Sequence, residues 1–388
     1  MAGLARPQAR PRALEKRGAM DQNAEPDQAE ARMSTYLNAG GHGLPSQAQR
    51  ARLLAHARLE AEAGVLAAID AAQPELAELR GKAARLLGTA PRRVGLGHTT
   101  TQFWLAALTR MPLGGRRVLL SPHEWGTHVR FLRQVAPDRG LRLDVIPESE
   151  ALDPAAWAAR IGPDLGAILL PHVTSARGLV YPVARIAALP RPEQALVLVD
   201  AAQALGRVQV GLDELGADVV VSTGRKWLRG PRATAILALS DRAETVLGLE
   251  ARALEPLDAN LALRLGLNVA LDEVLALGVP AHAAALARIA LRFRAALAAH
   301  DRLAEWLDTG QGGEIAPGHV VLSVPLAEKP GIEARLQAAG ILVKWPTPSV
   351  EEPLSQAARA QDRALLRITP HLYNDDAEAE ALAAVLAG

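Results

Sequence analysis

An aspartate and a lysine each follow a short apolar segment in the middle of the sequence. Asp200 comes directly after residues 196–199, and Lys226 lies a few residues beyond the next apolar segment, 219–221. Both segments have the length and composition of buried strands. Because α/β proteins place their ligands at the carboxyl ends of such strands, we expect the two side chains to lie close together there.

This pair of residues suits the chemistry of one cofactor, pyridoxal 5'-phosphate. The cofactor needs a lysine amine for a Schiff base and a carboxylate that keeps its ring nitrogen protonated, so that the ring can absorb carbanion charge. Thr223, Gly224 and Arg225, which precede the lysine, suit a phosphate group. The alternative is structural: Asp200 caps a helix and Lys226 lies in solvent. The pair together with its neighbours favours the cofactor.

Short apolar runs alternate with amphipathic stretches through the central part of the chain. The amphipathic stretches include residues 125–135 and 182–189. This alternation predicts an α/β fold with a mostly parallel sheet that is covered by helices on both faces. The predicted strands are residues 118–120, 143–146, 167–170, 196–199, 219–221 and 236–239.

The two ends of the chain differ from this central part. Residues 1–32 contain hardly any large apolar side chain, so they are predicted to be disordered. We expect an N-terminal arm and helix at 33–60, a large cofactor-binding domain at 61–255 and a smaller α+β domain at 256–388.

Helical spacing and stop signals give the expected elements at both ends. One helix is predicted from Ser46 to about Asp70, and a second from Pro74, a good first-turn residue, to Leu87. In the C-terminal part we expect long Ala/Leu helices, strands at 319–324 and 341–344, and a last helix from Asp375.

Composition excludes several classes of function. The chain has 43 Lys and Arg against 42 Asp and Glu, a balance that argues against nonspecific nucleic-acid binding. No uninterrupted apolar stretch approaches the roughly 18 residues of a membrane-spanning helix. The chain has no cysteine, which excludes disulfides, thiolate metal sites and a catalytic thiol. We expect a cytoplasmic protein with no metal site and no nucleic-acid or membrane partner.

Two motifs surround the Asp200–Lys226 pair: VDAAQALG at 199–206 and STGRKWLRGP at 222–231. They resemble the class V aminotransferase family of fold-type I pyridoxal-phosphate enzymes, and the resemblance extends roughly from Tyr36 to the C-terminus. It implies a large domain on a mostly parallel seven-stranded sheet with helices on both faces, a smaller α+β C-terminal domain, an amino-acid substrate and a homodimer.

The resemblance assigns cofactor roles to several residues of the two motifs. Lys226 would be the Schiff-base lysine, Asp200 the partner of the ring nitrogen, and Gln203 a neighbour of the ring 3-hydroxyl. Thr223 would contact the phosphate, and Arg225 stands where many members have a histidine that also approaches the phosphate.

The segment GPRATAILAL, residues 230–239, departs from the glycine-rich family pattern. Ala233 and Ala235 stand where glycines are common. By the resemblance, Thr234 is expected to reach the phosphate that is bound by a partner subunit.

Three segments upstream resemble further parts of the family's cofactor site. In GHTTTQF, 97–103, Thr100 and Thr101 open a predicted helix whose free backbone amides would bind the phosphate, although a plain threonine N-cap is the alternative. In SPHEWGTHV, 121–129, Trp125 would face the cofactor ring, with His123 and His128 as alternatives. In PHVTSARG, 171–178, Ser175 would lie near the 3-hydroxyl.

Two segments resemble the family's substrate-binding parts. In LLRITPHLYND, 365–375, Arg367 would bind the substrate carboxylate through its guanidinium group; a surface arginine is the alternative. Near the N-terminus, Asn38 and the AGGHG turn at 39–43 match the arm over the substrate pocket, where His42 would touch the substrate.

The family alone does not decide the reaction, since one fold supports several pyridoxal-phosphate chemistries. The lack of cysteine excludes a persulfide-forming desulfurase. The segment 57–76, together with DAAQALG, GRKWLRGPR and LRITPH, most resembles the C–S lyases of ergothioneine biosynthesis. This implies a β-lyase that acts on a cysteine conjugate or its sulfoxide, with Lys226 as the base and with pyruvate and ammonia as products. An aminotransferase, an amino-acid epimerase and a non-enzymatic binding scaffold remain alternatives.

Overall fold

The computed structural model describes residues 35–308, 312–357 and 362–388, all of which belong to one unit. The extension at 1–32, for which the sequence predicts disorder, lies outside the described residues. The predicted limits of the arm, the large domain and the small domain stay predictions.

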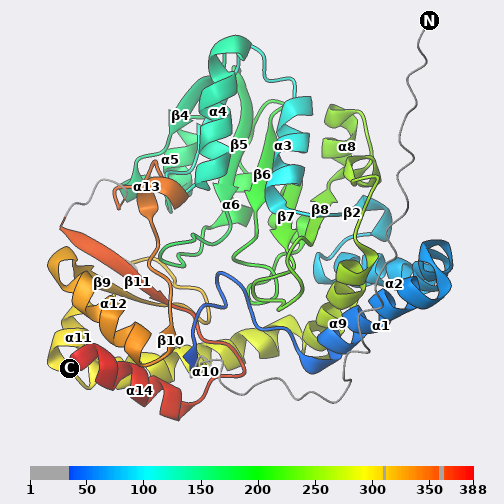
Figure 1. Ribbon diagram of the computed structural model, residues 1–388. Helices are drawn as coiled ribbons and strands as arrows, with labels where there is room; N and C mark the ends of the chain where they lie inside the picture. The colour runs from blue at the N-terminus through cyan, green and yellow to red at the C-terminus, as the bar shows by residue number, and fades with distance from the viewer. Residues whose placement is uncertain (1–34, 309–311, 358–361) are drawn as a thin grey trace, which may run out of the picture. The chain divides into compact units, whose positions relative to one another are not determined.

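A seven-stranded sheet forms the centre of the protein (Figure 1). Its strand order is β2-β8-β7-β6-β5-β3-β4, with parallel pairing from β7 to β4 and antiparallel pairing of β8 with both its neighbours. The predicted α/β fold with a mostly parallel seven-stranded sheet is confirmed. The strands are β2 (Val94–Gly97), β3 (Arg117–Leu120), β4 (Arg142–Val145), β5 (Leu165–Pro171), β6 (Leu196–Asp200), β7 (Val219–Thr223) and β8 (Ala235–Leu239).

Helices cover both faces of this sheet because its strands are apolar on both sides. Along β6, Val197 and Val199 belong to one buried cluster, whereas Leu196 and Leu198 belong to another. The first cluster includes side chains of α2 (Val65–Leu86), α6 (Val183–Ala187), α7 (Leu212–Leu215) and α9 (Leu261–Leu277). The second includes side chains of α3 (Thr100–Arg110), α4 (Gly126–Arg139) and α8 (Asp241–Leu247).

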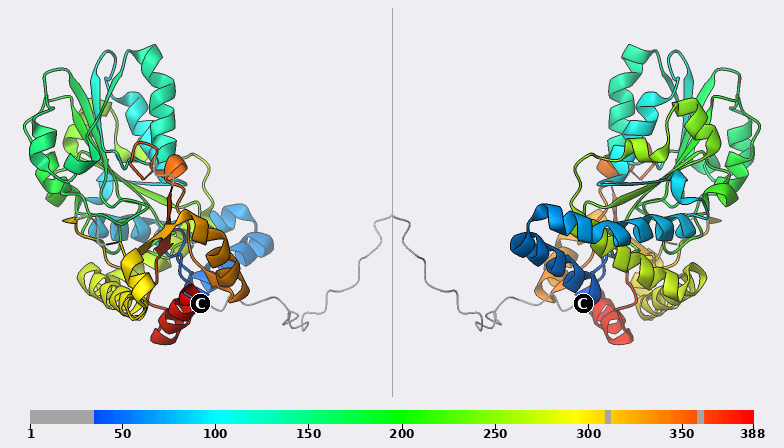
Figure 2. Two further views of the ribbon diagram at one scale, coloured as in Figure 1. Left: turned by 90° about the vertical axis from the view of Figure 1, so that its left-hand side faces the viewer. Right: turned by 90° about the vertical axis from the view of Figure 1, so that its right-hand side faces the viewer.

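The N-terminal helices differ from the prediction. Helix α1 (Gln47–Ala63) ends at Gly64, whose φ of 85° breaks the helical path, and α2 starts directly after it. The apolar spacing continues across this glycine, which is why the sequence suggested a single helix to Asp70. Pro74 lies inside α2 and not in its first turn. Both helices pack against α9, as the side views also show (Figure 2).

The C-terminal elements surround a second, two-stranded antiparallel sheet. It pairs β9 (Val320–Pro325) with β11 (Arg363–Ile368), and its register places Arg367 opposite Val321. A parallel pair joins β1 (Thr35–Tyr36) of the N-terminal arm to β10 (Ile341–Leu342). The helices of this part are α10 (Val279–Ala298), α11 (Asp301–Trp306), α12 (Lys329–Ala338), α13 (Pro348–Glu351) and α14 (Asp376–Ala387); α5 (Pro154–Ala158) lies beside α6.

Among the described helices, no single one is both long and apolar enough to span a bilayer. The pair α9 and α10, which meet at 86°, meets the length and composition criteria only when taken together.

Candidate active site

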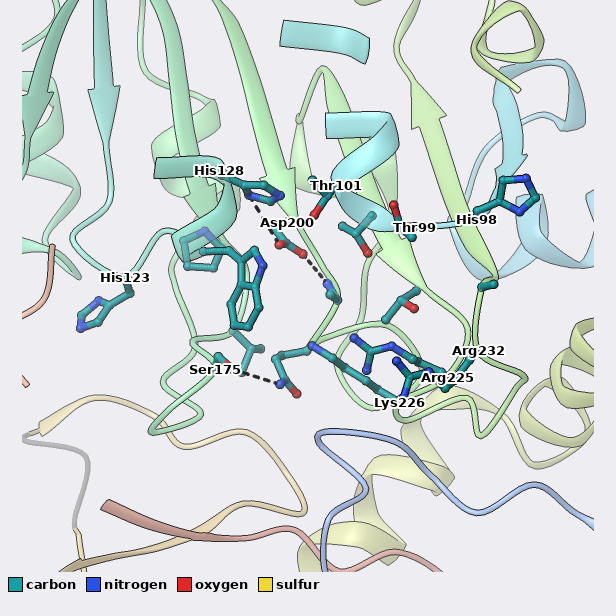
Figure 3. A pocket seen from close by; sticks show the side chains of 18 residues that line it. His98, Thr99, Thr101, His123, His128, Ser175, Asp200, Arg225, Lys226 and Arg232 are labelled. Atoms are coloured by element: carbon teal, nitrogen blue, oxygen red, sulfur yellow. Dashed lines mark hydrogen bonds and ion pairs between the residues drawn. The ribbon is translucent and has the colours of Figure 1, made fainter. Parts of the chain in front are cut away.

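A cavity of about 380 Å³ lies where β5, β6 and β7 end (Figure 3). Because β6 and β7 are parallel neighbours with Asp200 opposite Val221, their carboxyl ends lie side by side, as expected. Nine predicted cofactor residues line this one cavity: Thr100, Thr101, Trp125, Ser175, Asp200, Gln203, Thr223, Arg225 and Lys226.

Lys226 follows β7 and is buried, so its placement in solvent, the structural alternative, is wrong. Among the described residues, no side chain or carbonyl accepts a hydrogen bond from its amine. Burial lowers the pKa of this amine to about 7; the charge of Arg225 acts in the same direction, and that of Asp200 opposes it. Near neutral pH a large share of the amine is therefore unprotonated, and able to act as a nucleophile or to accept a proton.

Asp200 ends β6 and presents its carboxylate to the cavity. Its Oδ1 accepts a hydrogen bond from the backbone N–H of Ala202 at 2.8 Å. Its Oδ2 lies 4.0 Å from Nδ1 of His128. A protonated ring nitrogen in the cavity would find an acceptor in this carboxylate.

Gln203 and Ser175 place hydrogen-bond donors in the same cavity as the Lys226 amine and the Asp200 carboxylate. The indole N–H of Trp227 donates to Gln203 Oε1 at 3.0 Å, which fixes the orientation of the amide. Gln203 Nε2 therefore faces the carbonyl of Gly40, at 2.9 Å, and Ser175 Oγ, at 3.5 Å. An oxygen substituent on a bound ring would meet donors here.

The beginning of α3 supplies the hydroxyl-rich end of the cavity. Thr99 is the N-cap, since its hydroxyl accepts a hydrogen bond from Gln102 N–H at 3.0 Å. The hydroxyls of Thr100 and Thr101 make no hydrogen bond to another described residue, and they adjoin the unpaired backbone amides of the helix N-terminus. Such an end binds anions.

Cations and a further hydroxyl approach the cavity from the β7–β8 connection. Thr223 donates its hydroxyl hydrogen to the carbonyl of Thr234 at 3.2 Å, which leaves the oxygen lone pairs free. Arg225 donates to the carbonyl of Gly41. Arg232, which was not predicted, is a second guanidinium that lines the cavity close to Arg225 (Figure 3). Its place within GPRATA was the available signal. His98 and Thr99, also not predicted, line the cavity too.

The structure does not bring Thr234 to the cavity of its own chain. Its hydroxyl donates to the Pro231 carbonyl at 2.7 Å, and the residue is buried. Contact with the phosphate of a partner subunit stays a prediction. Ala233 beside it has a φ of 57°, a left-handed conformation that explains why glycine is common at this position.

All three aromatic candidates for the ring face line the cavity, but the rings of two of them are engaged in other contacts. His123 lies 2.7 Å from the Tyr181 hydroxyl and 3.4 Å from Glu148. His128 stacks on Trp104, with ring centroids 4.1 Å apart. Trp125 lines the cavity and stays the predicted contact for the cofactor face.

Arg367 and Asn38 meet next to the cavity but do not line it. Arg367 Nη1 donates to the Ser175 carbonyl at 2.8 Å, and Nη2 donates to Asn38 Oδ1 at 3.3 Å. Its Nε is buried without a partner among the described residues, and burial lowers the pKa of the group. The alternative of a surface arginine is wrong. The N–H groups of Ser175 and Ala176 donate to the buried carboxylate of Glu352, at 2.7 and 2.9 Å.

His42 lies on the arm that covers the Lys226 loop and does not line the cavity. The Tyr36 hydroxyl donates to the His42 carbonyl at 2.5 Å, and Nδ1 of His42 is buried without a partner among the described atoms. The next residue, Gly43, is packed so tightly that a Cβ there would lie 2.6 Å from the Lys226 carbonyl. A substrate contact of His42 stays a prediction.

The donor set of the cavity fits pyridoxal 5'-phosphate. Lys226 offers a buried amine without a hydrogen-bond partner, and Asp200 offers a carboxylate for the ring nitrogen. Gln203 and Ser175 offer donors for the 3-hydroxyl, while the start of α3 and Arg225 offer an anion site for the phosphate. These groups match the cofactor's functional groups, and the cavity has the size of a small-ligand site.

Comparisons with known proteins agree with this assignment. Residues 54–249 match the family described as aminotransferase class-V. A Mycobacterium tuberculosis protein described as a "probable hercynylcysteine sulfoxide lyase" is 32% identical over 359 residues, 86% of this chain and 85% of that protein. An isopenicillin N epimerase of Amycolatopsis lactamdurans is 31% identical over 55% of this chain and 56% of that enzyme.

The fold has close structural relatives as well. The apo structure of a cysteine desulfurase from Thermococcus onnurineus NA1 superposes with a TM-score of 0.77 at 19% identity, covering 91% of this chain and 94% of that one. The family match, the similarity over most of the chain and the donor set lead to one conclusion: this chain belongs to the class V aminotransferase family and is a pyridoxal-phosphate-dependent enzyme.

Proposed function

We propose that the enzyme is a C–S β-lyase. Its substrate is a cysteine conjugate or the sulfoxide of one, similar to hercynylcysteine sulfoxide, and its products include pyruvate and ammonia. The observation that carries the proposal is the 32% identity with a protein described as such a lyase, which extends over 86% of the chain. The chain has no cysteine, so it lacks the nucleophile that persulfide formation requires.

Bound pyridoxal phosphate supplies an electron sink for negative charge at the substrate α-carbon. Lys226 then serves as the general base, since its amine has a pKa of about 7 and is unprotonated in a large share of molecules at neutral pH. Nζ of Lys226 accepts the α-proton in this proposal.

Asp200 and Gln203 hold the ring in its reactive form. The Asp200 carboxylate keeps a proton on the ring nitrogen, while Gln203 Nε2 donates to the 3-hydroxyl oxygen. Trp227 supports this role because its indole N–H prevents the Gln203 amide from turning its oxygen toward the cavity. Thr100, Thr101, Thr223 and Arg225 bind the phosphate.

Arg367 binds the substrate carboxylate through the side of its guanidinium that carries Nε and Nη2. The support is its hydrogen-bonding pattern: Nη1 is committed to the Ser175 carbonyl, Nε has no partner among the described residues, and Nη2 makes only a 3.3 Å contact with Asn38. Two adjacent N–H groups match the two oxygens of a carboxylate. Asn38 and His42 line the substrate side in this proposal.

The bond that breaks joins the substrate β-carbon to sulfur. Its electron pair leaves with sulfur, as a sulfenate from a sulfoxide or as a thiolate from a thioether. The three-carbon fragment that remains takes up water and gives pyruvate and ammonia. No oxidant or keto-acid acceptor is consumed.

The product assay tests the proposal. Purified enzyme is incubated with cysteine-conjugate sulfoxides in the absence of any keto acid, and pyruvate is measured with lactate dehydrogenase. We expect stoichiometric pyruvate and ammonia. Turnover that requires a keto acid would indicate an aminotransferase instead, and inversion at the α-carbon without pyruvate would indicate an epimerase, which the isopenicillin N epimerase relative makes the second candidate.

We also propose that the enzyme works as a homodimer. A groove of about 990 Å³ lies beside α2 and the segment 252–264, and His98 lines both this groove and the active-site cavity. Leu257 on its rim is completely exposed, and Leu66 of α2 is 79% exposed. A second copy that covers these side chains would also reach the cavity.

Sedimentation tests the dimer. We expect a dimer at micromolar concentration for the wild type and for the control Leu326→Asp, which changes an exposed leucine of the C-terminal part. Leu257→Asp should shift the equilibrium toward monomer. An active wild-type monomer would contradict the proposal.

A further inference from the structure

A buried carboxylate–imidazole pair lies next to Asp200. Glu124 lies two residues before α4 and His128 lies in its first turn, and neither has any exposed surface. Nδ1 of His128 lies 2.8 Å from Oε1 of Glu124. The imidazole also stacks on the indole of Trp104 at an interplanar angle of 8°. The stack fixes the plane of the imidazole, and the carboxylate fixes its rotation.

This pair faces the carboxylate of Asp200. Figure 3 shows the His128 ring beside Asp200, and its Nδ1 is 4.0 Å from Asp200 Oδ2. One atom from each of Glu124, His128 and Asp200 lies within 4.8 Å of the other two. Asp200 Oδ1 accepts from the Ala202 backbone, so Oδ2 is the oxygen that faces His128.

Nδ1 of His128 lies near the carboxylates of both acids, Glu124 and Asp200. Two nearby carboxylates repel each other when both are ionised, and a buried carboxylate without a partner is strongly unfavourable. His128 is the one basic side chain that is hydrogen-bonded or ion-paired to Glu124 among the described residues. With its hydrogen on Nδ1, the imidazole donates to Glu124 and adjoins Asp200.

We propose that Glu124 and His128 are positioning residues for Asp200. Glu124 holds the Nδ1–H of His128 beside Asp200, and this polar hydrogen favours the ionised carboxylate. The proton that Asp200 shares with the cofactor therefore stays on the ring nitrogen. The proposal rests on the cofactor role of Asp200 given above. Carboxylate–imidazole pairs orient functional groups in the same way in catalytic triads and behind zinc ligands.

The test reads the protonation of the ring nitrogen directly. Enzyme is reconstituted with pyridoxal phosphate that carries ¹⁵N in the ring, and the nitrogen chemical shift is measured by NMR. Wild type should show a protonated nitrogen. Glu124→Gln keeps the shape of the side chain but removes its charge, and His128→Phe keeps the stack on Trp104 but removes the N–H. Both should move the signal toward the unprotonated form and lower kcat about 10- to 100-fold, with KM nearly unchanged.

Two further variants separate positioning from general damage. His172→Phe removes another buried imidazole near Asp200, one whose ring makes no hydrogen bond to the described residues, and it should keep the wild-type signal. His128→Asn restores an N–H near the position of Nδ1 and should recover part of the protonated signal.

Two results would overturn the proposal in distinguishable ways. A wild-type nitrogen signal in Glu124→Gln and His128→Phe would remove the pair from the site; if His128→Phe does not fold, Glu124→Gln decides alone. An unprotonated nitrogen in the wild-type enzyme would instead remove Asp200 from its assigned role, and the pair with it.

Discussion

Lys226 and Arg367 are both buried cations at the active site, yet the structure treats them differently. The amine of Lys226 has no hydrogen-bond partner among the described residues, whereas Arg367 donates to Ser175 and Asn38. Burial lowers the pKa of both groups. A lysine responds by losing its proton near pH 7, but a guanidinium remains charged because its usual pKa is far higher. Burial therefore makes Lys226 available as a neutral base, whereas Arg367 stays a permanent cation.

The supporting elements account for this difference. Lys226 lies in the loop after β7, at the ligand-binding edge of the central sheet, and its amine makes no hydrogen bond to the described residues. Arg367 lies within β11, opposite Val321 of β9, and its backbone is held in a strand ladder. The amine without a hydrogen-bond partner suits proton transfer, and the guanidinium held by hydrogen bonds suits orientation of a substrate.

The largest expected effect comes from Lys226→Ala. Turnover should fall below detection because the variant lacks both the covalent anchor and the base, while circular dichroism should show an intact fold. In wild type, borohydride should fix the cofactor to the peptide that contains Lys226. The matched control is Lys82→Ala, which changes a lysine paired with Asp272 outside the cavity and should keep full activity. A label on another lysine would contradict the assignment.

Removal of the Asp200 carboxylate should reduce turnover nearly as much. It changes the cofactor site around Lys226 and leaves the Arg367 site unchanged. Asp200→Ala should retain some cofactor but lose several orders of magnitude in kcat, since the ring nitrogen can then lose its proton. Borohydride labelling of Lys226 should persist. Near-normal turnover would show that another carboxylate serves the ring.

Arg367→Ala tests the other side of the comparison. The loss of a charge-assisted contact with a desolvated carboxylate costs about 2–5 kcal/mol, so kcat/KM should fall roughly 30-fold to several-thousand-fold. The visible absorbance of the bound cofactor should stay unchanged. Arg367→Lys, which keeps the charge but not the paired N–H groups, should recover only part of the loss. A colourless or unfolded Arg367→Ala variant would indicate a structural role.

The smallest expected effect is on the thermal stability of the cofactor-free protein, where Lys226 and Arg367 can be compared directly. Lys226→Met should raise its thermal stability, because the folded state no longer holds a buried amine without a partner. Arg367→Met should lower it by about 1–3 kcal/mol, because it leaves the Ser175 carbonyl and Asn38 without a donor. If the two substitutions change the thermal stability at pH 7 in opposite directions, the difference between the two cations is confirmed. A change in the same direction would contradict it.

The stabilisation by Lys226→Met should also depend on pH. The folded protein has its Lys226 pKa near 7, while the unfolded chain has the ordinary value of 10.5. Between these values the unfolded state binds more protons, so the stability of the cofactor-free wild type rises with pH relative to the variant. The advantage of Lys226→Met should be greatest below pH 7 and decline toward pH 10.5. At about 1.4 kcal/mol per pKa unit, the change amounts to a few kcal/mol at most.

The parts of the fold that the sequence predicted are those with a strong local signal. The apolar runs of β3 and of β5 to β8 stand out because both faces of these strands are buried. The edge strand β4 is only partly buried, and its two apolar residues, Leu143 and Val145, pack on one side. Strand β2, with the sequence VGLG, was missed because its two glycines weaken the pattern. Strand β11 was interpreted only as the arginine segment, since two arginines interrupt its apolar residues.

The candidate site likewise has residues that the sequence predicted and residues that it did not. The residues predicted around Lys226 and Asp200 belong to continuous motifs, and they line one cavity. Glu124 and His128 also belong to a motif, 121–129, but the sequence suggested His128 only as an alternative contact for the ring face. Their relation to Asp200 depends on how α4 packs beside β6. The break between α1 and α2 was missed for a similar reason: Gly64 ends a helix whose apolar spacing continues unchanged.

Ser175 makes the two halves of the site interdependent. Its hydroxyl meets Gln203 on the cofactor side, its carbonyl accepts from Arg367 on the substrate side, and its N–H is tied to Glu352. Any shift of Arg367 toward a substrate carboxylate changes the hydrogen bonding of the residue that also adjoins Gln203. If substrate binding changes the cofactor affinity by some factor through this residue, then cofactor binding must change the substrate affinity by the same factor, because the coupling of two binding equilibria is reciprocal.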